Sequence, residues 1–152
     1  MSDSLKARIA EETKATMRAR DSRKLGVLRL VGAEIKRVEV DERRELADDD
    51  VLAVLERMTK QRVDSERQFR DAQRQDLAEQ EAFEIAVIRA FMPVPFTEDE
   101  LASIVAQAIA EAGATSAREM GAVMNLLRPR VLGRADMKAV SAQVKAKLGQ
   151  GG

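Results

Sequence analysis

The stretch GATSAREMGAVMNLLRPRVLGRADMKAVSAQVKAKL, residues 113–148, carries the clearest helical signals in the chain. Its first half places apolar side chains at i, i+3, i+4 and i+7, which is the spacing of one helix face. These residues are Met120, Val123, Met124 and Leu127. The second half continues with a similar stripe, made by Met137, Val140, Val144 and Leu148. The stretch therefore predicts two amphipathic helices joined by a short turn.

Capping residues predict where these two helices begin and end. Ser116 with Glu119 three residues later predicts a capping box for the first helix. Pro129 is expected to end that helix, because proline supplies no amide and clashes with the preceding turn. Asp136 is a suitable N-cap for the second helix, and Gly149 suits its C-terminal cap.

The joint between the two helices is basic, since residues 115–150 carry 7 basic and 2 acidic side chains. Arginine offers paired donors that suit phosphate, so a polyanion site is predicted; the alternative is that the charges only solubilise helix faces. Base-stacking readers of single strands need aromatic platforms, and the C-terminal unit of residues 97–148 has only Phe96 at its edge. Contact with RNA backbone and shape is therefore expected. The candidate cations are Arg118, Arg128, Arg130, Arg134, Lys138 and Lys145.

Two glycines near this joint are candidates for close approach. Gly121 falls inside the first predicted helix, where glycine costs about 1 kcal/mol relative to alanine. Close helix packing is the favoured compensation, and close approach of an RNA backbone or a protein partner is the alternative. Gly133, in the turn, is the second candidate.

The remaining periodicity predicts an all-α fold, with an N-terminal bundle of about four helices before a three-helix unit. The expected N-terminal helices cover about 5–20, 21–38, 48–72 and 76–91. Asp76 with Glu79 has the cap-plus-acid spacing for the last of these. The third helix is long, and its second half is mostly charged, so partial exposure is expected, with Glu66 and Arg70 as an i,i+4 ion pair.

A proline-rich link gives the best domain boundary. Met92-Pro93-Val94-Pro95 is stiff and biased away from helix, which predicts domains at 1–94 and 95–152. Beyond the link, Thr97 with Glu100 predicts a capping box, and Gly113 is expected to be a left-handed C-terminal cap.

Composition excludes several kinds of active site. The chain has no cysteine and no histidine, so it lacks a thiolate nucleophile, a cysteine zinc site and the usual general base near neutral pH. Its carboxylates lie on charged helix faces, and the run Asp48-Asp49-Asp50 fits a helix start. We expect no catalytic residues, no cofactor and no metal. No signal peptide or membrane span is visible, so a cytoplasmic protein without membrane contact is expected.

Short motifs along nearly the whole chain resemble the GatB/YqeY family. The most specific are Met120-Gly121 with Val123-Met124, and Gly133-Arg134-Ala135-Asp136; Lys60-Gln61-Arg62 supports them. Where a Tyr-Leu-Pro is common before the tail unit, this chain has Phe91-Met92-Pro93. The chain thus looks like a YqeY-like protein. The resemblance implies an all-helical fold whose C-terminal unit is similar to the tail of the GatB subunit of the aspartyl/glutamyl-tRNA amidotransferase, which helps hold the tRNA.

The resemblance implies an accessory role in translation. We expect a non-catalytic module that binds tRNA, not DNA, or assists a glutamine-dependent tRNA amidotransferase or an aminoacyl-tRNA synthetase. The alternative is a protein–protein interaction module that docks a partner through the long third helix, the acidic middle or the Met120/Met124 stripe. The family label also implies carbon–nitrogen ligase activity with glutamine as amide donor, for which no activated nucleophile is visible.

Overall fold

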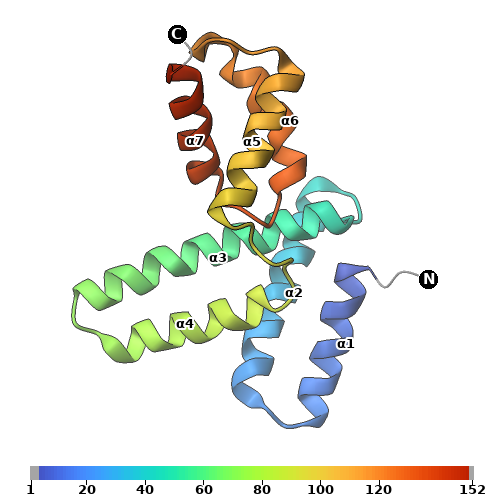
Figure 1. The fold of residues 1–152 in the computed structure, drawn as a ribbon. Helices are drawn as coiled ribbons and strands as arrows, with labels where there is room; N and C mark the ends of the chain where they lie inside the picture. Colours follow the sequence, from blue (N-terminus) through green and yellow to red (C-terminus); the bar gives the residue numbers. More distant parts are fainter. Residues whose placement is uncertain (1–3, 151–152) are drawn as a thin grey trace. The chain divides into compact units, whose positions relative to one another are not determined.

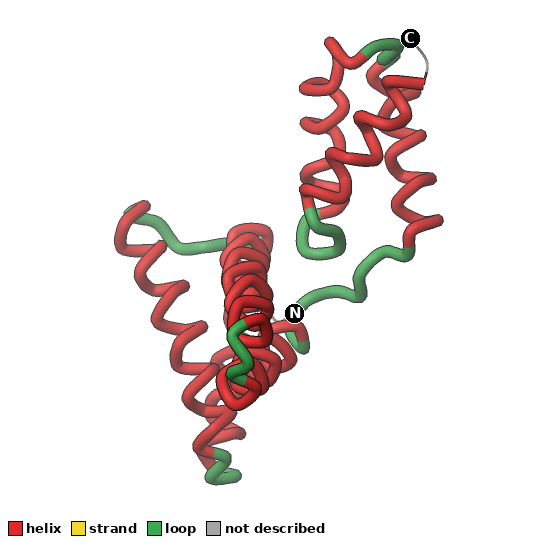
Figure 2. Tube along the Cα trace, turned by 90° about the vertical axis from the view of Figure 1, so that its left-hand side faces the viewer, coloured by secondary structure: helices red, strands yellow, loops and turns green. Residues whose placement is uncertain are grey.

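The secondary structure of the described chain is helical. The computed structural model describes residues 4–150, and Figure 2 shows helices and loops over this range, without strands. The all-α prediction is confirmed. The helices are α1 (Leu5–Arg18), α2 (Ser22–Glu42), α3 (Asp48–Asp71), α4 (Gln75–Arg89), α5 (Glu98–Ala112), α6 (Met120–Val131) and α7 (Met137–Gln150), with a 3₁₀ turn, η1 (Ala117–Glu119), before α6. None of these helices contains an apolar stretch of membrane-spanning length.

The chain divides into two compact units, one ending at Pro93 and one starting at Val94. Residues 93–97 have no regular secondary structure. Two of these five residues are prolines, which cannot donate backbone hydrogen bonds. The outer ends of the two predicted domains, residues 1–3 and 151–152, lie outside the described residues.

Aspartate side chains accept hydrogen bonds at the starts of α2 and α3. Asp21 accepts a hydrogen bond from the Lys24 amide at 3.2 Å, as an N-cap should. At the start of α3, Asp48 accepts one from the Leu5 amide at 2.9 Å, which ties α3 to the start of α1. Asp50 accepts from the amide that precedes the helix. The aspartate run is therefore a helix start, as predicted.

The N-terminal core lies where two helical hairpins, α1–α2 and α3–α4, meet (Figure 1). Its most deeply buried side chains include Leu28, Val31, Val51, Leu55 and Ile88. The buried residues of α3 stop at Thr59, so residues 60–71 are at most partly buried. The prediction of a long, partly exposed third helix is confirmed, and the Glu66–Arg70 pair forms at 2.8 Å.

A half-buried ion pair holds the outer part of the α3–α4 hairpin together. Arg62 lies 3.1 Å from Glu84, and the two side chains are 16% and 13% exposed. Arg62 also donates to the Met58 carbonyl oxygen at 3.2 Å. The pKa of nearby Glu81 is raised, mainly by burial and to a smaller extent by the negative charge of Glu84. Arg62 of the Lys60-Gln61-Arg62 motif thus joins two helices of this unit.

The C-terminal unit is a three-helix arrangement with its own core. The Thr97–Glu100 capping box is confirmed by reciprocal hydrogen bonds of 3.0 and 3.1 Å. Gly113 ends α5 with φ +63°, as predicted. Fully buried side chains from the three helices form the core, namely Val105, Val123, Leu127, Val131, Val140 and Val144.

Pro129 does not end α6, which continues to Val131. Proline removes one backbone hydrogen bond near the helix end, where few bonds remain to be lost. Val131 is fully buried, and its packing favours two more helical residues after Pro129. Gly149 likewise lies inside α7 and does not cap it.

Two predicted caps take other forms. Ser116 makes no side-chain capping bond, and Glu119 accepts instead from the Thr115 amide at 2.8 Å. This bond precedes the 3₁₀ turn, which separates Ser116 from α6. Asp76 lies inside α4 and pairs with Arg74 at 3.1 Å.

Candidate nucleic-acid interface of the C-terminal unit

The joint between α6 and α7 is a tight turn. The amides of Arg134 and Ala135 both donate to the Val131 carbonyl oxygen, at 2.8 and 3.1 Å. Gly133 has φ +73°, a conformation that glycine adopts without the penalty of a side chain. Asp136 then accepts from the Lys138 amide at 3.3 Å. Gly133 is thus explained by the turn, and close approach of a ligand there stays a prediction.

Arg134 holds the start of the C-terminal unit. Its Nε donates to the Val94 carbonyl oxygen at 2.8 Å, and its own carbonyl oxygen accepts from the Phe96 amide at 2.9 Å. The guanidinium carbon lies 3.8 Å from the centre of the Phe96 ring, a cation–π contact. Two of these contacts occupy the Arg134 side chain, which the sequence analysis proposed as an RNA contact. We therefore place Arg134 among the residues that shape the joint.

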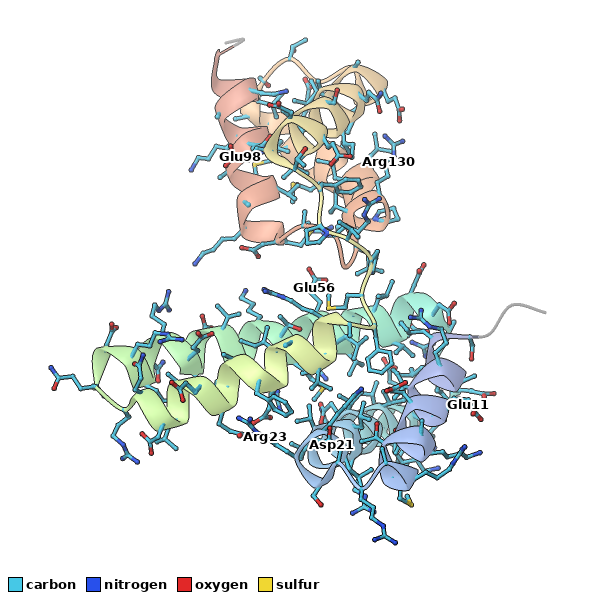
Figure 3. The ribbon with its side chains drawn as sticks, turned by 60° about the horizontal axis from the view of Figure 1, so that its bottom comes forward. Glu11, Asp21, Arg23, Glu56, Glu98 and Arg130 are labelled. Carbon is cyan, nitrogen blue, oxygen red and sulfur yellow. The ribbon has the colours of Figure 1, made fainter. Side chains whose placement is uncertain are left out.

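Arg128 and Arg130 lie on the exposed side of the last turns of α6. Arg128 donates to Asn125 at 2.8 Å, which orients the guanidinium along the helix surface. Arg130, labelled in Figure 3, forms an ion pair with Glu111 of α5. Their side chains remain 36% and 51% exposed, so this pair is a surface pair and not a buried one. Both arginines can still be reached from solvent.

The other three candidate cations are exposed, and they do not all lie at the joint. In the part of the chain that the structure describes, the side chains of Arg118, Lys138 and Lys145 form no hydrogen bond or ion pair. Lys138 is in the first turn of α7, whereas Lys145 lies about 10 Å further along at 1.5 Å per residue. The 3₁₀ turn with Arg118 packs on α7. In Figure 1 it lies by the end of α7.

The six cations therefore form two groups. The joint group is Arg128, Arg130, Arg134 and Lys138, and the far group is Arg118 and Lys145. Ala122 and Asn125 lie on the exposed face of α6. Asn125 is a polar residue of this face that the sequence analysis missed; its place three residues before Arg128 was the available signal.

No other helix of the described residues packs closely against Gly121. A Cβ atom built there would meet no atom of the described residues within 4 Å, apart from the local helix backbone. The favoured explanation of this glycine is therefore wrong. Met124 is buried in the core of this unit, and Met120 packs against the same core. Met124 is therefore a core residue, and the prediction that it belongs to an adaptable interface is wrong; for the partly buried Met120 that role stays a prediction.

The chemistry available here is electrostatic. The hydrogen bonds of the capping box lower the pKa of Glu100, and the charge of Arg134 adds to this shift. Among residues 4–150, no three acidic side chains are arranged to hold a metal ion. Exposed guanidinium and ammonium groups can bind phosphate oxygens through charge-assisted hydrogen bonds.

Comparison with known families matches residues 6–148 to one described as Yqey-like protein. The chain belongs to this family. The match covers both compact units, so the α3–α4 hairpin and the basic joint are parts of one family pattern. A search of curated proteins gives no significant match.

Proposed function

We propose that this YqeY-like protein is a non-catalytic accessory module that binds tRNA through its backbone and shape. The observation that carries the proposal is a set of exposed cations on η1, α6 and α7, to which the described structure gives no carboxylate partner. These are Arg118, Arg128, Lys138 and Lys145. Such cations release counterions when they meet phosphates, which provides sequence-independent affinity.

The type of RNA contact follows from the composition of the surface. The C-terminal unit has Phe96 as its aromatic residue, and that ring lies under Arg134. It is therefore unsuited to stacking on bases. A helix face with exposed Gly121 and Ala122 leaves room for a phosphate backbone to approach α6. The proposed ligand is a folded RNA recognised by shape, as tRNA is.

A cellular role follows as a second step of the proposal. A module that binds tRNA without reacting with it would assist an enzyme that charges tRNA, either an aminoacyl-tRNA synthetase or a glutamine-dependent amidotransferase. The GatB tail resemblance supports this step. Carbon–nitrogen ligase activity by the chain itself would need an activated nucleophile, and release of ammonia from glutamine by the purified protein would establish it.

Filter binding with bulk tRNA tests the proposed site. Arg128→Gln with Lys138→Gln should weaken binding, whereas Lys60→Gln with Arg67→Gln, which removes the same charge from exposed positions of α3, should not. Equal binding by both double variants would overturn the site. A pull-down from lysate with and without nuclease tests the alternative of a protein partner, since partners that survive nuclease would favour it.

A further inference from the structure

A second basic surface lies in the N-terminal unit, in the groove between α1 and α2. The groove has a volume of about 610 Å³. Its lining includes four cations and one carboxylate, namely Lys6, Lys14, Arg29, Lys36 and Glu39. The charge is thus net positive, although the N-terminal unit as a whole is not. No part of the proposed function uses this groove.

The two helices place these cations in opposed pairs. Figure 1 shows α1 and α2 running antiparallel, and the 2.6 Å ion pair between Lys6 and Glu39 fixes the start of α1 beside the end of α2. Lys6 and Lys14 are eight residues apart, or about 12 Å along α1. Arg29 and Lys36 are seven apart, or about 10 Å along α2. One cation of each helix therefore lies toward each end of the groove.

Small residues lie between the cations on both helices. Ala10 separates Lys6 from Lys14, and Gly32 separates Arg29 from Lys36. A Cβ atom at Gly32 would meet no atom of residues 4–150 within 4 Å, leaving aside the local helix backbone, so the middle of the groove is open at α2. Ile9, Leu28 and Ile35 are almost fully buried beneath it. A ligand backbone can therefore lie in the groove with cations on either side.

Three of the four cations are available to a ligand. Lys6 is engaged with Glu39, and this bond is the main cause of the lowered pKa of that carboxyl. Lys14 makes a loose, exposed pair with Glu11 at 3.7 Å. In the described part of the chain, Arg29 has no ion pair or hydrogen bond, and Lys36 is an exposed side chain whose charge also lowers the pKa of Glu39.

We infer that the α1–α2 groove is a second site for the phosphodiester backbone of RNA. The inference rests on the proposed function, which it extends from one unit to both. The short link at residues 93–97 keeps the two basic surfaces on one molecule. Binding at one surface then raises the effective concentration at the other, so two weak contacts yield a tighter complex.

The test measures bulk tRNA binding to the full-length chain at several salt concentrations. The groove variant is Arg29→Gln with Lys36→Gln, the joint variant is Arg128→Gln with Lys138→Gln, and the control is Lys60→Gln with Arg67→Gln. All substituted positions are exposed or on charged helix faces, so folding should be kept, and circular dichroism checks this. The groove variant should weaken binding and make the salt slope shallower by about one per cation removed.

The outcomes separate the two proposals. Loss in the joint variant with no loss in the groove variant keeps the proposed function and overturns the groove. Loss in the groove variant with none in the joint variant supports the groove and overturns the joint site. Gly32→Glu, which adds a carboxylate to the middle of the groove, should weaken binding, and Gly32→Ala should not. If poly-glutamate competes with tRNA as strongly as RNA does at equal charge, and the groove variant loses this competition, the groove takes acidic peptides and its assignment to RNA is overturned.

Discussion

Replacing Arg134 by alanine should destabilise the C-terminal unit. The cation–π contact with Phe96 contributes about 0.5–1 kcal/mol at an exposed site. The hydrogen bond to the Val94 carbonyl oxygen is charge-assisted and contributes about 1.5 kcal/mol or more when buried. Because Arg134 is partly exposed, we expect a net loss of about 1–2 kcal/mol. Arg134→Lys should lose much of the same stabilisation, because lysine keeps the charge but lacks the planar guanidinium group.

Hydrogen–deuterium exchange of the full-length chain measures this loss. Amides near the start of α5 and in the joint should exchange faster in Arg134→Ala, while amides of α1–α4 should not change. Arg130→Ala is the matched control, because its exposed pair with Glu111 is worth about 0–1 kcal/mol. Unchanged exchange in Arg134→Ala, combined with a large loss of tRNA affinity, would show that Arg134 contacts RNA and would refute its placement as a residue that shapes the joint.

Three further substitutions test the fold and its electrostatics. Gly121→Ala should stabilise the protein by about 1 kcal/mol in thermal unfolding, because the site is open; destabilisation would mean that the glycine is needed. Leu127→Ala should cost about 2–5 kcal/mol in denaturant unfolding, and a cost under about 1 kcal/mol would contradict its place in the core. The Arg44 side chain and the Ala47 amide lower the pKa of Asp50 to about 2. The stability it provides is therefore lost as pH falls from about 4 towards 2, and Asp50→Asn should flatten that part of the pH profile.

Local signals in the sequence were enough to predict most helices. The capping box joins Thr97 and Glu100, which are three positions apart. The left-handed cap at Gly113 likewise depends on residues of the same helix end. In both motifs the local sequence pattern is enough to predict the contact. The prediction that Pro129 ends the helix was wrong, because it considered the missing hydrogen bond alone. The burial of Val131, which favours continuing the helix, is visible only in the folded unit.

The roles of single arginines could not be predicted in this way. Arg134 contacts Val94 and Phe96, some forty residues earlier in the chain, and nothing local to Arg134 indicates that contact. The pair between Arg130 of α6 and Glu111 of α5 is also set by helix packing and not by local sequence. The sequence predicts where positive charge gathers, whereas packing decides which guanidinium groups remain free for a ligand. The α1–α2 groove was missed because its cations come from two helices that look unremarkable when read one at a time.

The salt dependence of tRNA binding to the unmodified protein tests the central claim most directly. If exposed cations hold the RNA backbone, the logarithm of the association constant should fall linearly with the logarithm of salt concentration. Each phosphate contact steepens the slope by about 0.7–0.9. Four cations of η1, α6 and α7 have no carboxylate partner among the described residues, so they predict a slope of about −3 or steeper. No binding at low salt, or an affinity that does not change with salt, would contradict the account.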